Sequence, residues 1–180
     1  MIDEVGYLDR MEDIRWFPWT IDAVRLLNRA GYLVFVVTNQ GGIGLGLFDE
    51  PFVLGLHDSL DATLRESGAR IDGWFLCPHH PRATVAGLET PCACRKPGRG
   101  MIDAACERWQ VDLERSWVVG DRDVDVLMAA AVGARGILVR TGYGERELRR
   151  KPEVFSAGTP VVMNLMEATA LILSQGDSAA

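Results

Sequence analysis

The stretch from Cys77 to Pro97 holds most of the residues in this chain that bind metals well. Three of the four cysteines and two of the three histidines lie in it. One residue separates Cys77 from His79, one separates Cys92 from Cys94, and twelve separate the two pairs. Two such hooks joined by a loop supply three thiolates and one imidazole, a donor set that suits structural zinc better than a reduced cysteine pair beside solvated histidines. We therefore predict a loop-holding zinc whose four ligands are Cys77, His79, Cys92 and Cys94.

A second chemical group follows an apolar run near residue 119. The segment 120–125 reads Gly-Asp-Arg-Asp-Val-Asp and puts three carboxylates at the start of a predicted helix. One aspartate there is an ordinary helix cap, which suffices for Asp123. Three carboxylates repel one another, and oxygen ligands suit Mg²⁺. We expect Asp121, nearest the strand end, to bind Mg²⁺ directly and Asp125 to support it from behind.

The polar turn after residue 37 is a candidate anion site. Thr38, Asn39 and Gln40 supply a hydroxyl and two amides and are followed by glycines, so that they can donate hydrogen bonds to a phosphate. The alternative is an ordinary turn. Lys96 lies between Arg95 and Pro97 at the end of the zinc loop and offers a cation to the same phosphate. The alternative is a solvated surface lysine, but such a residue would not need a loop held by a metal to position it.

Composition limits the partners. The 180 residues suit one domain, 48% of them are hydrophobic, and the net charge is -6. The acidic balance argues against nucleic acid or an anionic membrane as the main partner. The N-terminus lacks a signal-peptide pattern, so that the cysteines indicate a reducing compartment, and we expect the cytoplasm. Cys106 lies in an apolar helical pattern and is expected to be a packed thiol.

The elements that must position these groups alternate along the chain. Strands are expected at 32–37, 74–76, 117–119, 136–139 and 160–162. Helices are expected from Thr20, as cap, to 30, and at 49–68, 101–110, 124–132 and 165–173, with loops at 38–46 and 140–151. This order predicts an α/β doubly wound domain over 1–175 with a parallel sheet and a flexible tail at 176–180. Ligands of such sheets bind beyond the carboxyl ends of the strands, where Thr38, Cys77 and Asp121 lie.

Several motifs together resemble the haloacid dehalogenase superfamily of Mg²⁺-dependent phosphatases. They are Val-Thr-Asn-Gln at 37–40, Cys-Pro-His-His-Pro at 77–81, Cys-Arg-Lys-Pro at 94–97, Val-Gly-Asp at 119–121 with Asp125, and Leu-Val-Arg-Thr-Gly at 138–142. The two cysteine-containing motifs are typical of the branch with the heptose-bisphosphate and histidinol-phosphate phosphatases. The resemblance covers about residues 2–173.

The resemblance implies roles for individual residues. Thr38 and Lys96 would hold the transferring phosphoryl group, and Asp121 would bind Mg²⁺. Residues Asn39, Gln40, Arg95 and Arg122 would lie near the substrate. It also implies a monomer acting on a small phosphorylated molecule, with a sugar phosphate such as a heptose bisphosphate as the first choice and histidinol phosphate as the alternative.

Two departures from the family pattern stand out. Leu45 occupies the place where the family usually has arginine, which affects how the distal part of a substrate is held. The family also begins with a central apolar strand ending in Asp-x-Asp-Gly, which carries the nucleophile and the general acid/base. Gly6-Tyr7 fits the flap that follows this motif in the family. If Asp9 were the first aspartate of the motif, the second would fall at residue 11, which is methionine. We therefore expect the nucleophile to belong before Met1.

Three hypotheses follow for the function. The first is a phosphatase whose full-length form uses an aspartyl-phosphate while this chain is inactive and marginally folded. The second is a non-catalytic relative that keeps the anion pocket as a binding or scaffold protein. The third is a zinc-centred interaction module. The joint presence of Thr38, Lys96 and Asp121 favours the first.

Overall fold

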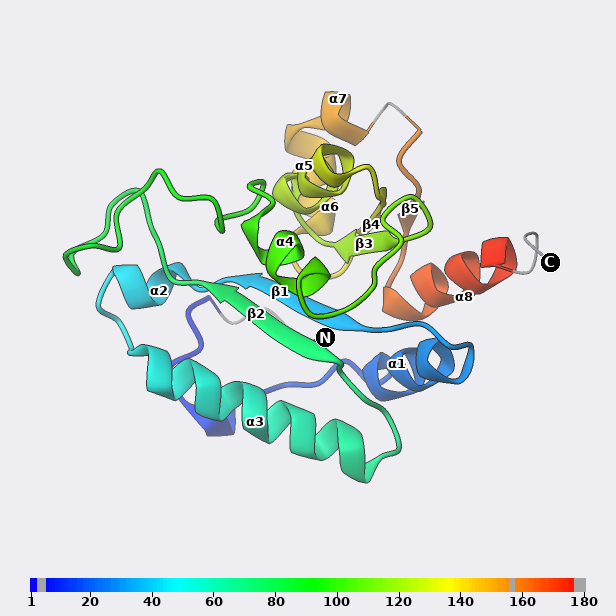
Figure 1. Cartoon of the computed structure of the whole chain (residues 1–180), viewed down its shortest axis with the longest axis horizontal. Helices are drawn as coiled ribbons and strands as arrows, with labels where there is room; N and C mark the ends of the chain where they lie inside the picture. The colour runs from blue at the N-terminus through cyan, green and yellow to red at the C-terminus, as the bar shows by residue number, and fades with distance from the viewer. Residues whose placement is uncertain (3–5, 156–157, 177–180) are drawn as a thin grey trace.

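Parallel strand pairs organise the chain, as the alternation of elements predicts. A computed structural model describes residues 1–2, 6–155 and 158–176. Strand β1 (Phe35–Asn39) pairs with β2 (Gly73–Cys77), and β3 (Trp117–Gly120) pairs with β4 (Arg135–Val139), which pairs with β5 (Val161–Val162). Among the described residues these ladders form two separate sheets, of two and three strands, with no ladder joining β1 to β3 (Figure 1).

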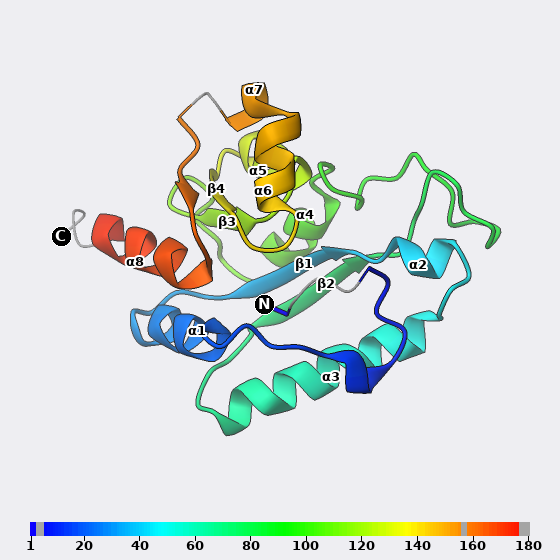
Figure 2. The same cartoon turned by 180° about the vertical axis from the view of Figure 1, so that it is seen from behind.

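Helices cover both sheets on both faces. Helices α1 (Thr20–Arg29) and α3 (Glu50–Glu66) pack on one face of β1 and β2, and α4 (Gly100–Cys106) packs on the other. Helix α8 (Leu165–Gly176) packs on β4 from the side opposite α5 (Asp123–Val132), and Figure 2 shows α1 and α8 side by side. Short helices fill the connections: η1 (Met11–Asp13), α2 (Gly41–Gly44), α6 (Gly144–Arg150) and α7 (Pro152–Phe155).

The backbone groups of alternate residues in β1 point toward the edge that, among the described residues, pairs with no other strand. Gln40 N donates to Cys77 O, and Asp72 N donates to Val34 O, so that even-numbered residues face β2. Phe35 and Val37 therefore point their N–H and C=O groups away from β2. The same argument applies to β3, because Ser116 O accepts from Arg135 N, which leaves the backbone groups of its odd residues facing away from β4.

Several expected boundaries were wrong. The first strand begins at Phe35, not residue 32, because Val34 bonds instead to the Asp72 side chain, and it continues through Thr38 and Asn39, which had been placed in the loop. Thr20 is not a cap, since it lies inside α1 and its hydroxyl donates to Met1 O at 2.7 Å. The expected loop at 38–46 contains α2.

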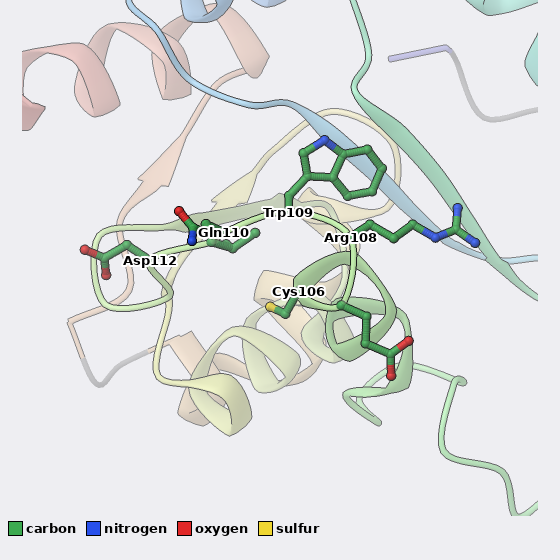
Figure 3. Close-up of a pocket in the computed structure, with 7 residues that line it drawn as sticks. Cys106, Arg108, Trp109, Gln110 and Asp112 are labelled. Carbon is green, nitrogen blue, oxygen red and sulfur yellow. The ribbon is translucent and has the colours of Figure 1, made fainter.

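Two further expectations failed. The expected helix at 101–110 ends at Cys106, and the chain then curls around a hollow of about 580 Å³ lined only by residues 106–112 (Figure 3). Cys106 is therefore half-buried at a helix end. The expected loop at 140–151 contains α6, whose Glu145 and Arg149 form an i,i+4 ion pair at 3.6 Å.

The two chain ends are described only in part. Met1 packs its side chain on the cluster of Val24 and Leu64, and Ile2 forms a single antiparallel bridge with Trp16. Most of the expected flexible tail, 177–180, lies outside the described residues. No helix in the described ranges is long and apolar enough to cross a membrane.

Candidate active site

The four expected zinc ligands converge. Their ligand atoms all lie within 4.8 Å of one another. The Cys77 sulfur is 3.7 Å from that of Cys92, 3.0 Å from that of Cys94 and 3.6 Å from His79 Nδ1. A tetrahedral zinc with sulfur bonds of about 2.3 Å separates its sulfurs by about 3.8 Å. The Cys77–Cys92 and Cys92–Cys94 pairs match this spacing at 3.7 Å each, the Cys77–Cys94 pair is shorter at 3.0 Å, and the donor set fits zinc in its chemistry.

The burial of the Cys77 thiol favours a bound cation at this cluster. Cys77, at the end of β2, is completely buried, and that burial, aided by the nearby Cys94 thiol, raises the pKa of the Cys77 thiol. A divalent metal reverses such a shift, because it binds and stabilises the thiolate.

The loop held by these ligands packs on α2. Gly44 N donates to Pro78 O at 3.0 Å, and Thr84 N donates to Gly44 O at 2.7 Å. Arg95 donates from Nη1 to His79 O at 2.6 Å, which ties the second hook to the first. A Cβ at Gly41 would lie 2.9 Å from the His80 ring, so that glycine is needed for this close contact. The loop that carries the Cys/His cluster is thus bonded to the loop that follows β1.

Lys96 is held in place by both sheets. Its ammonium donates to Val37 O, on the unpaired edge of β1, at 2.9 Å, and forms an ion pair with Asp125 Oδ1 at 2.7 Å. Its backbone is clamped by Asn39, whose Oδ1 accepts from Lys96 N at 2.9 Å and whose Nδ2 donates to Lys96 O at 3.3 Å. The Asn39 amide therefore positions Lys96, a role that the sequence did not indicate.

Thr38 is the next-to-last residue of β1 and directly follows Val37, whose carbonyl Lys96 contacts. Gln40 donates from Nε2 to Thr38 Oγ1 at 3.1 Å and so orients the hydroxyl. A hydroxyl, an amide and an ammonium thus gather at the carboxyl end of β1, where the strand rule places a ligand.

The carboxylates after β3 have different surroundings. Asp125 is 5% exposed, and its two oxygens accept from Lys96 and, at 3.0 Å, from Arg122 N. A Cβ at Gly120 would overlap Asp125, so that only glycine allows this approach. Because both oxygens of Asp125 have protein partners, it is suited to support the site rather than to bind a metal directly.

Asp121 is better suited than Asp125 to bind a metal ion directly. Its Oδ2 accepts from Tyr143 N at 2.8 Å. Burial raises the pKa of Asp121, the charge of Asp125 adds to that rise, and the Tyr143 N–H and Lys96 oppose it. The amino group of Met1 is close enough for Asp121 to raise its pKa, although burial lowers that pKa more. A buried carboxylate beside a second one is a suitable place for a cation, and its oxygen donors fit Mg²⁺.

The remaining expected substrate residues lie around this centre. Arg122, exposed, has its guanidinium carbon 5.2 Å from the centre of the Tyr143 ring. Tyr143 was missed by the sequence reasoning, because it lies in the segment expected to be a loop. Leu45 follows α2 and is half-buried.

Comparisons with known proteins agree with this arrangement. The family described as "HAD-hyrolase-like" matches residues 93–168. The D-glycero-beta-D-manno-heptose-1,7-bisphosphate 7-phosphatase of Rhodopseudomonas palustris is 44% identical over 130 residues, 72% of each chain. The enzyme of the same name from Escherichia coli K12 is 37% identical over 139 residues, 76% of this chain and 72% of that protein.

The chain belongs to the haloacid dehalogenase superfamily of phosphatases, in the heptose-bisphosphate phosphatase branch.

A solved member of this superfamily extends the likeness to the fold. The D,D-heptose 1,7-bisphosphate phosphatase of B. bronchiseptica, complexed with magnesium and phosphate, matches with a TM-score of 0.83 at 32% identity, over 96% of this chain and 92% of that one. The resemblance inferred from the sequence motifs is therefore confirmed, as is the α/β fold of haloacid dehalogenase type.

Asp9 lines a hollow of about 520 Å³ together with Ile43, Phe48, Phe52 and Val85, and Thr38, Lys96 and Asp121 are not among the residues that line it. Tyr7, two residues earlier, packs edge-on against Phe48 with ring centres 6.4 Å apart. The flap expected around Gly6-Tyr7 stays a prediction. The sequence pattern would make Met1-Ile2-Asp3-Glu4 the tail of the nucleophile motif, and Asp3 and Glu4 lie outside the described residues.

Proposed function

We propose that this protein is built to hydrolyse a small sugar phosphate with Mg²⁺, with the 7-phosphate of D-glycero-D-manno-heptose 1,7-bisphosphate as the first substrate to test. The observation that carries the proposal is the bridge made by Lys96, which joins the end of β1 beside Thr38 to the carboxylates after β3. Two relatives that are 44% and 37% identical to this chain have the corresponding activity in their names.

Each residue has a defined task in this proposal. Thr38 and Lys96 bind oxygens of the phosphoryl group, and Lys96 neutralises the charge that grows on them as the bond to the leaving group breaks. Asp121 holds Mg²⁺, which when bound supplies further charge neutralisation. Asp125 fixes Lys96, and Gln40 orients the Thr38 hydroxyl. Zinc bound by Cys77, His79, Cys92 and Cys94 keeps the loop that carries Lys96 in place, outside the reaction itself.

The nucleophile is the missing part of this scheme. We propose that it is an aspartate on a strand between β1 and β3, where both strands point backbone groups toward an unpaired edge. Such a strand would place its carboxyl end beside Thr38 and Asp121. Without it, the protein binds phosphate but does not form the aspartyl-phosphate intermediate.

One observation favours a second substrate, histidinol phosphate. The hollow beside α2 is lined by the carboxylates of Asp9, Asp49 and Glu50 and by aromatic rings, and Leu45 offers no positive charge near it. Carboxylates repel a second phosphate and attract an amine or an imidazolium. We further propose that the protein acts as a monomer in the cytoplasm.

Phosphate binding tests the proposal directly. Isothermal titration of inorganic phosphate with Mg²⁺ should give one site per chain, and Lys96→Met should abolish it. Adding the heptose bisphosphate or histidinol phosphate to the phosphate-loaded protein should displace the phosphate. The compound that competes more tightly identifies the group to which the phosphate is attached in the substrate. If phosphate binds equally to the Lys96→Met protein, the proposed site is wrong.

A further inference from the structure

The turn from Thr141 to Gly144 lies against the carboxylate that the proposed function assigns to Mg²⁺. Gly144 N donates to Thr141 O at 3.1 Å and closes the turn. A Cβ at Gly144 would overlap Val139 O, so that the turn sits directly on the end of β4. Its position relative to the sheet is therefore fixed by the backbone of β4.

Gly142 makes the closest approach to Asp121. Its φ is +60°, a left-handed conformation that residues with a Cβ adopt at a cost. An added Cβ would also overlap Asp121 Oδ2. Two independent constraints, conformation and space, thus require glycine here, and the second depends on where the Asp121 carboxylate lies.

Tyr143 makes two contacts with the site through different groups. Its backbone N–H donates to Asp121 Oδ2 at 2.8 Å. Its ring lies under the guanidinium of Arg122, 5.2 Å from the ring centre. Arg122 follows Asp121 directly, and its own N–H donates to Asp125 Oδ2 at 3.0 Å. The backbone of Tyr143 thus orients one carboxylate, while its side chain restrains the neighbouring cation.

We infer that the Thr141–Gly144 turn is a positioning element of the phosphate site, in which Gly142 and the Tyr143 N–H orient Asp121 for a cation and the Tyr143 ring orients Arg122 for an anion. The inference rests on the proposed function, because Mg²⁺ and phosphate are the ligands assumed. It assigns separate effects to the two residues: a change at Gly142 affects the cation, and a change in the Tyr143 ring affects the anion.

A pair of glycine variants tests the predicted effect on cation affinity. Gly133 ends α5 with a φ of +77° and has nothing within 4 Å of an added Cβ, so that Gly133→Ala shares the conformational cost of Gly142→Ala without the overlap. Mg²⁺ titrations should show an affinity about tenfold or more lower for Gly142→Ala, the size of effect found when groups that orient metal ligands are lost. Gly133→Ala should keep the unaltered affinity. Equal Mg²⁺ affinities in the two folded variants overturn the inference.

The predicted effect on anion affinity is tested with Tyr143 variants, so this test does not require Gly142→Ala to fold. Tyr143→Leu keeps the backbone N–H and removes the ring, so that Mg²⁺ affinity should stay unchanged while affinity for inorganic phosphate falls about 2–5-fold, the size expected for an exposed cation–π contact. Tyr143→Phe keeps the ring and should bind phosphate like the unaltered protein. Arg122→Gln should cause a loss at least as large as that of Tyr143→Leu, and the double variant should lose no more than Arg122→Gln.

A matched cation–π pair controls for general effects. Arg135 lies 5.0 Å over the Trp117 ring, at the opposite end of β3 and β4, and Arg135→Gln should leave phosphate affinity unchanged. Phosphate affinity that is the same in Tyr143→Leu and the unaltered protein overturns the inference while leaving the proposed function standing. An unaltered protein that binds neither Mg²⁺ nor phosphate overturns both.

Discussion

The Cys/His cluster and the Asp121 site are built in different ways. All ligands of the cluster come from one continuous segment, 77–94, and they meet within 4.8 Å. The Asp121 site instead takes backbone and side-chain groups from four segments: the end of β1, the loop at Lys96, the start of α5 and the turn at Tyr143. The first site is therefore local and complete, while the second depends on how the two sheets are held together.

The largest expected effect comes from breaking the local site. Cys94→Ser removes one of four ligands, so zinc content should fall from one per chain to near zero. Stability should fall by about 5 kcal/mol, or about 10–20 °C in melting temperature for a chain of this size. Cys106→Ser, a cysteine outside the cluster, should change neither quantity. Metal analysis and thermal melting measure both, and full zinc retention in Cys94→Ser would disprove the ligand assignment.

An intermediate effect comes from breaking the link between the sheets. Lys96 and Asp125 have side chains 14% and 6% exposed, and Lys96→Met leaves the Asp125 carboxylate buried without its cation. The cost should be about 3–5 kcal/mol in the free energy of unfolding. Lys96→Met combined with Asp125→Asn should recover most of that loss, because no unpaired charge remains. Urea unfolding of the four proteins measures this, and additive losses would argue against a direct link.

A smaller effect concerns the core of the two-stranded sheet. His57 on α3 is 6% exposed and stacks on Trp74 with ring centres 4.7 Å apart. Burial lowers the pKa of His57, while Asp58 opposes the shift. His57 therefore binds a proton more readily in the unfolded chain than in the folded protein. As a result, this histidine makes the free energy of unfolding fall as the pH drops below about 6.5.

His57→Phe keeps the stacked ring and removes the titration. Unfolding at pH 7.5 and pH 5.5 should show a smaller difference between the two pH values in His57→Phe than in the unaltered protein. Acid release of a metal from the cysteines affects both proteins alike and cancels in this comparison. An identical pH dependence in the two proteins would assign the acid sensitivity elsewhere.

The contrast between the sites also explains what the sequence predicted. The ligands of the cluster could be assigned from spacing alone, because Cys77, His79, Cys92 and Cys94 need only a loop to meet. The strands around Val119 and Ile137 were predicted because fully buried parallel strands are continuous apolar runs. A helix beginning at residue 49 was also expected, and Asp49 caps α3 by accepting from Phe52 N at 2.9 Å.

The contacts that the sequence did not indicate have a common physical cause. The Asn39 amide binds the backbone of Lys96, a contact between residues 57 positions apart that no local pattern indicates, and its place near a substrate stays a prediction. Tyr143 was overlooked because the charges of residues 144–151 were taken for a loop. The i,i+4 spacing of Glu145 and Arg149 was the available signal for α6.

The central claim is that Thr38, Lys96 and Asp121 form one phosphate site across the two sheets, and that its proposed nucleophile is an aspartate on a strand between β1 and β3. The most direct test compares this chain with a version carrying an added N-terminal apolar strand that ends in Asp-x-Asp-Gly. Phosphate release from a sugar phosphate with Mg²⁺ and thermal melting are measured side by side. The account predicts activity only in the longer version and a clearly higher melting temperature for it. Comparable phosphate release by the unextended chain would contradict the account and make Asp9 the next candidate nucleophile.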